Sequence, residues 1–273
     1  MTGGLQAAIV DLDGTMVDTL GDFDVALNRT LAELALPPVD RAFIERTIGK
    51  GSEHLIRSTL AAAGGDAAMY QAAWAHYQRL YRAINGDHAA VYDGVEAGLK
   101  RLRAAGLPLA CVTNKPRDFA AELLERKGLA GYFTQVFGGD SFERRKPDPL
   151  PFVRAAAALG SVPERTLVIG DSVNDATAAR AAGCPVVLVS YGYNHGQPVT
   201  RADADAVVDR LDQIDLAALG VASPGHCETA AHDDDHFTPI DRHRAPRPGS
   251  LALAPRAAPL MPAGWAHAPS PSV

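Results

Sequence analysis

The stretch Ala7-Ala8-Ile9-Val10-Asp11-Leu12-Asp13-Gly14-Thr15 decides how the rest of the chain is interpreted. It begins with a short apolar run, typical of a buried strand in a parallel sheet, and continues with two carboxylates and a glycine. Gly14 breaks the strand, so Asp11 and Asp13 follow its C-terminal end. Ligands of open α/β sheets bind at this edge, which makes both carboxylates candidates for a functional site. A strand-ending turn explains them equally well, because Asp and Gly are common turn residues.

From residue 92 onward, apolar runs alternate with helical patterns. The expected strands lie at 107–112, 135–137, 166–169, 185–189 and 206–208. The expected helices lie at 95–105, 117–127, up to 159 after Lys146-Pro147-Asp148-Pro149, and at 176–182. This alternation predicts right-handed crossovers and an α/β fold, a doubly wound parallel sheet with a Rossmann-like core.

Between the first strand and this region, residues 19 to about 86 contain helical patterns and no convincing strand. Apolar side chains recur there at helical spacing, for example Phe23, Leu27 and Leu31. We therefore expect a helical cap domain, inserted into the core after its first strand. The predicted division is a catalytic core of residues 1–18 and 90–220, with the cap at residues 19–89.

One loop of the expected cap combines two glycines, a cation and two hydroxyls, Thr47-Ile48-Gly49-Lys50-Gly51-Ser52. Such a loop suits a phosphate or carboxylate that the backbone approaches closely, although an ordinary glycine turn has the same composition. Gly49 and Lys50 are accordingly candidate substrate-binding residues. The aromatic residues farther along, which include Tyr77 and Tyr81, are interpreted as packing residues.

The composition is that of a soluble globular protein with small-molecule partners. The chain has 273 residues and a formal charge of −6, and no basic run is long enough to suggest nucleic-acid binding. No apolar run approaches a membrane helix, and the N-terminus lacks the layout of a signal peptide, so we expect a cytoplasmic protein. We expect the protein to be a monomer or a homodimer. Cys111, Cys184 and Cys227 are too few and scattered for a disulfide framework or zinc site, and the first two are expected to be buried free thiols.

Beyond residue 220 the composition changes to alanine, proline, histidine and isolated charges. Such a segment buries too little apolar surface to offset its ordering entropy, so residues 221–273 are expected to form a disordered tail. The run His232-Asp233-Asp234-Asp235-His236 within it resembles a metal-binding sequence, but a solvated charge cluster explains it more simply.

Polar residues follow four of the expected strands: Asp11 and Asp13, Thr113 and Asn114, Lys146, and Asp171 and Asp175. A parallel sheet brings these strand ends together. Carboxylates suit a hard divalent cation, hydroxyl and amide groups suit phosphate oxygens, and lysine supplies a point positive charge. A phosphate repels an anionic nucleophile, so such a site needs both Mg²⁺ and Lys146 to neutralise the developing charge. The sequence therefore predicts a phosphoryl-transfer site.

Four motifs in order, DLDGTMVD (11–18), VTN (112–114), KPDP (146–149) and GDSVND (170–175), resemble the haloacid dehalogenase superfamily. The resemblance implies that Asp11 is the nucleophile that forms an aspartyl-phosphate. It implies that Asp13 acts as acid toward the leaving alcohol and then as base toward water, while its backbone carbonyl binds Mg²⁺. A leaving alkoxide does need such a proton donor.

The same resemblance gives roles to the other motif residues. It assigns Thr113 and Asn114 to the phosphate, Lys146 to charge neutralisation and Asp171 to Mg²⁺. Asp175 is assigned to the outer shell of the metal or to holding Lys146. Members of the superfamily that cleave carbon–halogen bonds lack the second aspartate, so Asp13 favours phosphoryl transfer over dehalogenation.

Three longer stretches, 111–116, 138–151 and 182–198, are similar to the bacterial phosphoglycolate phosphatases. This resemblance implies hydrolysis of 2-phosphoglycolate, a small phosphorylated carboxylic acid, to glycolate and phosphate, with the Lys50 loop facing the substrate carboxylate. Alternatives are a phosphatase for another small phosphomonoester and a sugar phosphomutase, whose cap loop would have to bind a second phosphate. A non-catalytic module of the same fold would normally lack a nucleophile or metal ligand, and none is missing here.

Overall fold

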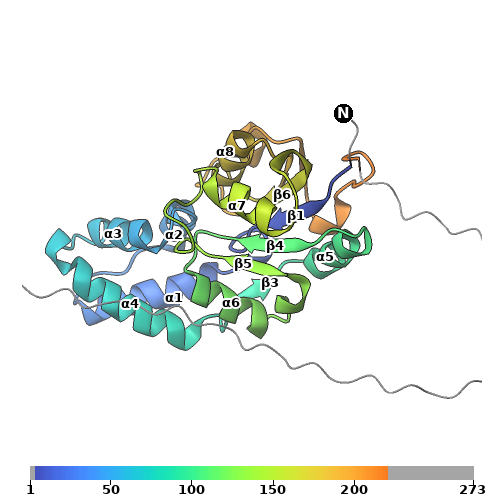
Figure 1. Ribbon diagram of the computed structural model, residues 1–273. Coiled ribbons are helices and arrows are strands. Elements are labelled where there is room, and N and C mark those ends of the chain that lie inside the picture. Colours follow the sequence, from blue (N-terminus) through green and yellow to red (C-terminus); the bar gives the residue numbers. More distant parts are fainter. Residues whose placement is uncertain (1–3, 221–273) are drawn as a thin grey trace, which may run out of the picture. The chain divides into compact units, whose positions relative to one another are not determined.

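The computed structural model describes residues 4–220 of the chain. The strands of its main sheet are β1 (Ala7–Val10), β4 (Leu109–Val112), β5 (Gln135–Phe137), β6 (Thr166–Gly170), β7 (Val186–Val189) and β8 (Ala206–Val208). All neighbouring strands are parallel, in the order β5-β4-β1-β6-β7-β8 (Figure 1). The predicted parallel sheet is thereby confirmed.

Helices cover both faces of this sheet, as expected of a doubly wound fold. They are α5 (Val95–Ala104), α6 (Arg117–Arg126), α7 (Leu150–Ala158) and α8 (Val173–Ala182). Ala8 and Val10 of β1 belong to the same buried cluster as α5 and α6, whereas Ile9 belongs to the cluster of α7 and α8. Successive side chains of a strand point to opposite faces, so β1 is apolar throughout because both of its faces are buried.

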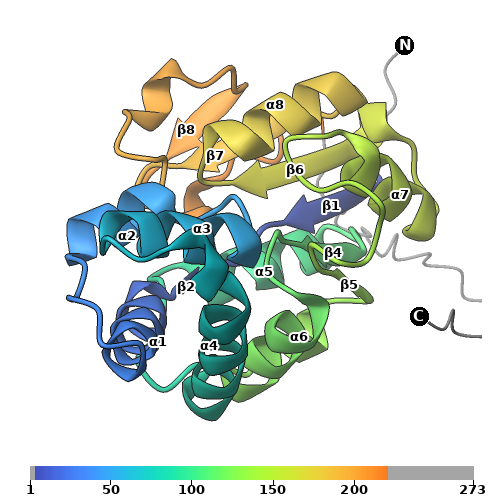
Figure 2. The same ribbon diagram turned by 90° about the vertical axis from the view of Figure 1, so that its left-hand side faces the viewer.

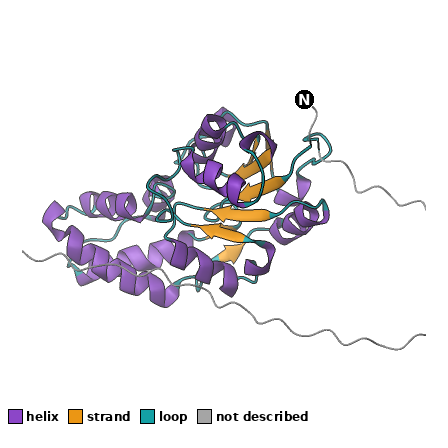
Figure 3. Ribbon diagram, in the orientation of Figure 1, coloured by secondary structure: helices purple, strands orange, loops and turns teal. Residues whose placement is uncertain are grey.

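Four further helices form the insert between the first strand and the rest of the core (Figure 2). They are α1 (Leu20–Glu33), α2 (Arg41–Thr47), α3 (Ser52–Ala62) and α4 (Tyr70–Ile84). They bury a hydrophobic cluster that includes Leu27, Ile56 and Tyr77, and Phe119 and Tyr193 of the core also belong to it. Figure 3 shows this part as helices joined by loops, beside the end of the sheet to which the strand arrows point. The expected helical cap is therefore present at the edge where the motif residues lie.

A two-stranded antiparallel ribbon, which the sequence patterns did not predict, joins insert and core. It pairs β2 (Val17–Asp18) with β3 (Ala90–Val91). Five single-turn 3-10 helices complete the elements within residues 4–220: Ala67–Met69, Ala130–Tyr132, Pro163–Arg165, Val199–Arg201 and Leu211–Gln213.

The start of α8 also differs from the expectation of a helix from residue 176. The helix begins at Val173, because Ser172 and Asp175 form a capping box: the backbone N–H and hydroxyl of Ser172 both donate to Asp175 Oδ2, at 3.2 and 2.8 Å. This places Asp175 in the first turn of α8.

Several sequence expectations concern residues outside 4–220. The predicted tail, its histidine-flanked acidic run and Cys227 all lie there. Cys111 and Cys184 are free and buried, as expected. Within residues 4–220, none of the helices combines the length and apolar character that a membrane-spanning segment requires.

Candidate active site

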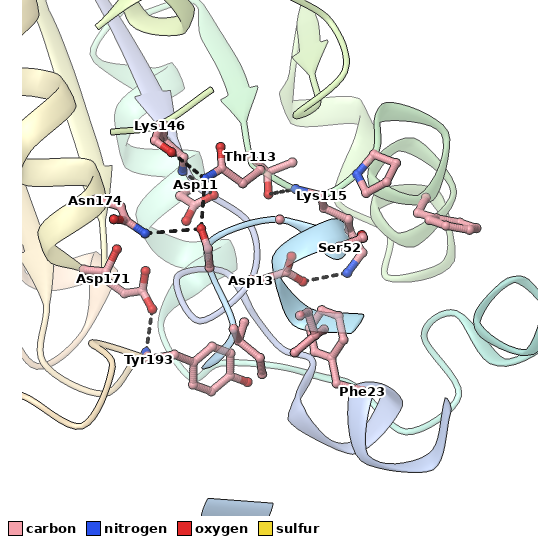
Figure 4. A pocket seen from close by; sticks show the side chains of 18 of the residues that line it. Asp11, Asp13, Phe23, Ser52, Thr113, Lys115, Lys146, Asp171, Asn174 and Tyr193 are labelled. Carbon is pink, nitrogen blue, oxygen red and sulfur yellow. Dashed lines mark hydrogen bonds and ion pairs between the residues drawn. The ribbon is translucent and has the colours of Figure 1, made fainter. Parts of the chain in front are cut away.

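A pocket lies between the C-terminal ends of the strands and the helical insert (Figure 4). Both parts of the protein line it. The core contributes, among others, Asp11, Asp13, Thr113, Asn114, Lys115, Lys146, Asp171, Asn174 and Asp175. The insert contributes Phe23, Ile48, Gly49, Gly51, Ser52, Leu55, Tyr77 and Tyr81. The motif residues predicted from the strand ends are thus brought together around one pocket.

Lys146 lies between two carboxylates. Its Nζ donates a hydrogen bond to Asp175 Oδ1 at 2.7 Å and another to the Val112 carbonyl at 3.1 Å, and it forms an ion pair with Asp11 Oδ1 at 2.8 Å. Burial lowers the pKa of Lys146, but the charges of Asp11 and Asp175 outweigh it and raise that pKa above its ordinary value. Lys146 is therefore a permanent positive charge beside Asp11, and Asp175 holds it there.

Asp11, Asp171 and Asp175 each offer a carboxylate oxygen, and these oxygens lie within 4.8 Å of one another in a buried cluster. Burial and the charge of Asp175 raise the pKa of Asp11 to about 7, against the lowering effect of Lys146. Burial, followed by the charges of Asp175 and Asp11, raises the pKa of Asp171 well above its usual range. These three carboxylates repel one another, and Lys146 offsets their charge by a single positive charge, so a further cation would stabilise the cluster.

The donor set of this cluster fits a hard divalent cation. The ion pair with Lys146 lacks hydrogen-bond geometry, so Asp11 Oδ1 is buried without a hydrogen-bond donor. One oxygen of Asp171 is held in place, because Asp171 Oδ2 accepts the backbone N–H of Tyr193 at 2.6 Å. Carboxylate oxygens are the ligands that Mg²⁺ prefers in proteins. Asp11 and Asp171 could hold such an ion, whereas both oxygens of Asp175 already accept hydrogen bonds.

The Asp13 carboxylate is not part of this cluster. Its Oδ1 accepts hydrogen bonds from Thr19 Oγ1 and from Lys115 Nζ, both at 2.8 Å. Asp13 lies two positions after Asp11 in sequence, but the two carboxylates contact different lysines, Lys115 and Lys146. The pocket therefore contains two acid–lysine pairs with separate surroundings.

Thr113 and Asn114 line the pocket as predicted, but part of their hydrogen-bonding capacity is used internally. The Asn114 amide donates to the carbonyls of Gly49 and Lys146, both at 2.9 Å, and Thr113 Oγ1 accepts the backbone N–H of Lys115 at 3.2 Å. Asn114 thereby ties the glycine loop of the insert to the core.

Among the described residues, the glycine loop meets the pocket through Ile48, Gly49, Gly51 and Ser52. Gly49 and Gly51 adopt φ angles of 100° and 88°, which glycine tolerates best, and both line the pocket. The Lys50 side chain between them is exposed and is not among the lining residues. The expectation that Lys50 faces the substrate is thus not supported by its position.

The sequence reasoning missed Lys115 and the pocket role of two tyrosines. Lys115 is buried, follows Asn114 directly, and donates to the Tyr81 hydroxyl at 2.7 Å. Tyr77 and Tyr81 are packed in the core of the insert, as expected, yet both also line the pocket. The signal for Lys115 was its place in the Thr113-Asn114-Lys115 run directly after β4, and all three of these residues line the pocket.

Comparison with known proteins agrees with this arrangement. Residues 8–189 match the family model described as haloacid dehalogenase-like hydrolase. The chain is 43% identical over 215 residues to a phosphoglycolate phosphatase of Thiobacillus denitrificans, covering 78% of this chain and 95% of the relative. It is 41% identical over 210 residues to the phosphoglycolate phosphatase of Nitrosospira multiformis, covering 76% and 92%.

This chain is also similar to a solved structure. The crystal structure of a predicted phosphoglycolate phosphatase from Haemophilus somnus superposes with a TM-score of 0.74 at 29% sequence identity, over 78% of this chain and 97% of that one. The family match spans β1 to β7 and includes every core residue of the pocket up to Asp175. The chain therefore belongs to the haloacid dehalogenase-like hydrolase family.

Proposed function

We propose that this protein is an Mg²⁺-dependent phosphatase that hydrolyses 2-phosphoglycolate to glycolate and phosphate. The observation that carries the proposal is the buried Asp11 carboxylate, which lies against Lys146 and within one cluster with Asp171 and Asp175. The names of the relatives support the substrate. Membership of the family supports hydrolysis as the reaction type.

In the first step, an oxygen of the Asp11 carboxylate attacks phosphorus and the bond between phosphorus and the ester oxygen breaks. Asp13 gives its proton to the departing oxygen, which leaves as the hydroxyl of glycolate. In the second step, water attacks phosphorus of the aspartyl-phosphate, Asp13 takes a proton from that water, and the Asp11 carboxylate is regenerated. Lys146 offsets the negative charge on the phosphoryl oxygens throughout.

Asp11, the backbone carbonyl of Asp13 and Asp171 would hold Mg²⁺, which when bound supplies positive charge to the phosphoryl oxygens. Asp175 would orient Lys146 rather than bind the ion directly. Thr113 and Asn114 would bind phosphate oxygens. We further propose that residues 19–89 act as a cap that excludes water from the pocket, since Tyr81 and Gly49 of this segment contact core residues there.

Hydrolysis is favoured over phosphomutase activity by the composition of the pocket wall. A mutase has to bind a second phosphate while its intermediate turns round. The described insert residues that line the pocket are uncharged, and its lining lysines, Lys115 and Lys146, both come from the core. Among the described residues that line the pocket, the insert therefore contributes no cation that could bind a second phosphate.

A phosphate-release assay over small phosphomonoesters, with and without Mg²⁺, tests the proposal. We expect 2-phosphoglycolate to be hydrolysed with the highest kcat/KM and only in the presence of the metal. Asp11→Asn should abolish release from every ester, whereas Asp87→Asn, at a surface ion pair with Arg126, should leave it unchanged. Phosphate release by the Asp11→Asn protein would refute the mechanism, and a brisk reaction with other esters alone would refute the substrate.

A further inference from the structure

Lys115 is a buried cation whose surroundings differ from those of an ordinary surface lysine. Its side chain is 3% exposed, and its Nζ donates to Asp13 Oδ1 at 2.8 Å and to the Tyr81 hydroxyl at 2.7 Å. The ammonium group also lies 4.6 Å from the ring centre of Phe23. Burying an ammonium group is costly unless it is paired, so a lysine held here needs a reason.

The two lysines of the pocket are not equivalent. Lys146 donates hydrogen bonds to the Asp175 carboxylate and to the Val112 carbonyl, and it is also paired with Asp11 at 2.8 Å, so two carboxylates neutralise its charge. Lys115 has one carboxylate and one neutral hydroxyl as hydrogen-bond acceptors among the described residues. One N–H of Lys115 is therefore left for an acceptor in the pocket that it lines (Figure 4).

The position of Lys115 beside Asp13 defines where such an acceptor lies. The step that follows rests on the proposed function, in which Asp13 gives its proton to the ester oxygen. In 2-phosphoglycolate a single CH₂ group carries both this oxygen and the carboxylate. The Lys115 ammonium group is hydrogen-bonded to Asp13. When the ester oxygen faces Asp13, this ammonium group therefore lies beside the substrate carboxylate.

We propose that Lys115 and the Tyr81 hydroxyl form the subsite that binds a carboxylate on the carbon next to the ester oxygen. Lys115 comes from the core and Tyr81 from α4 of the insert, so the subsite is complete only when both parts face the pocket. The Tyr81 hydroxyl accepts from Lys115 and keeps its own O–H for the carboxylate. Lys115 is then the specificity-determining residue of the pocket, in place of the exposed Lys50.

The walls around this subsite strengthen the effect. Phe23, Leu55 and Phe119 line the same pocket, so the ammonium group faces an apolar surrounding. A substrate carboxylate satisfies Lys115 there, whereas an alkyl group of equal size would leave its remaining N–H unpaired. The subsite therefore favours an acid over a neutral ester.

Equilibrium binding separates this subsite from catalysis. In an Asp11→Asn background no ester is consumed, so calorimetry with Mg²⁺ present can compare 2-phosphoglycolate with ethyl phosphate, which has the same carbon chain without the carboxylate. We expect 2-phosphoglycolate to bind about 10–100-fold more tightly. Adding Lys115→Met should reduce this preference to within about threefold. Lys100→Met, at an exposed lysine paired with Glu96 on α5, is the matched control and should keep the preference.

A second variant guards against a folding defect in the Lys115→Met protein. Tyr81→Phe leaves the lysine and the ring packing in place and should weaken the preference severalfold without changing the affinity for ethyl phosphate. Circular dichroism establishes that each variant is folded.

A preference that survives Lys115→Met, or that is absent from the Asp11→Asn protein, overturns the subsite. If the preference depends on Lys115 but the unmodified chain releases phosphate from neither ester, the subsite stands and the proposed function fails. If the unmodified chain hydrolyses both esters with equal kcat/KM, the phosphatase stands and the subsite fails.

Discussion

Gly14 lies directly after the two motif carboxylates, where a side chain would collide with the candidate metal site. Its φ angle is 82°, and a Cβ atom there would lie 2.1 Å from Asp171 Oδ2. Gly106 has nearly the same φ, 80°, but a Cβ atom there meets nothing within 4 Å. Substitutions at these two glycines therefore distinguish the effect of backbone strain from the effect of displacing Asp171.

We expect Gly106→Ala to lower the free energy of unfolding by about 1 kcal/mol through strain alone and to leave activity unchanged. Gly14→Ala should cause the same backbone strain and should also lower kcat/KM more than about tenfold, because the new methyl group displaces Asp171. Chemical denaturation and phosphate-release assays on both variants check this. Full activity in the Gly14→Ala protein would contradict the role given to Asp171.

The proposed proton-transfer role of Asp13 can be tested by substitution. Removing its proton-transfer group with Asp13→Asn should lower kcat for 2-phosphoglycolate by about 10²–10⁴-fold. With p-nitrophenyl phosphate, whose leaving group needs no proton, the first turnover should remain fast and appear as a burst of nitrophenol. A first turnover slowed equally for both esters would show that Asp13 is not the acid of the first step.

The side-chain positions of Lys50 and Lys115 could not be predicted from the sequence. Lys50 and Lys115 both stand in polar turns next to apolar runs, and composition favoured Lys50 because of its neighbouring glycines. The direction of the Lys50 side chain depends on two residues with positive φ, which pattern analysis does not fix. Lys115 contacts Tyr81, which is 34 positions away in sequence, and only the packed insert reveals that contact.

His195 and the glycine loop form a clasp between two elements of the structure, the turn after β7 and the loop between α2 and α3. Asn174 Nδ2 donates to the Gly49 carbonyl and contacts His195 Nε2, both at 3.2 Å, while His195 Nδ1 lies 3.3 Å from the Arg46 carbonyl. An amide N–H only donates and a carbonyl only accepts, so the imidazole must be neutral with its proton on Nδ1.

This clasp predicts a pH dependence of stability. Burial, and then the charge of Lys50, lowers the pKa of His195 below its ordinary value of 6.5. A lowered pKa contributes stability above the unfolded-state value, and this contribution is lost as the pH falls through the folded-state value. Thermal unfolding from about pH 8 to pH 5 should therefore show a larger loss in the unmodified protein than in His195→Asn, in which residue 195 does not titrate. Asparagine tolerates the positive φ of 51° at this position. Equal losses in the two proteins would contradict the neutral clasp.

At the scale of elements, the sequence predicted the core well. Strands β1, β4, β6 and β7 are short apolar runs that end in polar residues or glycine, and both their burial and their edge follow from that pattern. The ribbon of β2 and β3 was missed because two-residue strands carry no periodicity. The start of α8 was missed because a capping box depends on a contact between Ser172 and Asp175 rather than on apolar spacing.

For the molecule as a whole, metal binding at the proposed carboxylate site is expected to stabilise the fold. A ligand that binds only the folded state stabilises it, by about 2.7 kcal/mol at 100 times its Kd. For a chain of this size that corresponds to a rise of roughly 5–10 °C in Tm. Mg²⁺ should produce such a rise, and a chelator should reverse it.

The same cluster predicts that one ligand substitution stabilises the metal-free protein. Burial and the charges of Asp175 and Asp11 disfavour an ionised Asp171, so a neutral amide in its place removes that repulsion. The Asn side-chain oxygen can still accept the backbone N–H of Tyr193 that Asp171 Oδ2 now accepts. We therefore expect Asp171→Asn to raise the Tm of the chelator-treated protein, to abolish the rise that Mg²⁺ produces, and to abolish phosphate release. Asp203→Asn, at an exposed ion pair with Arg180, is the control and should retain the Mg²⁺ response. A lower metal-free Tm in Asp171→Asn would mean that Asp171 stabilises the fold by itself, and that the clustered carboxylates are not held together at the expense of stability.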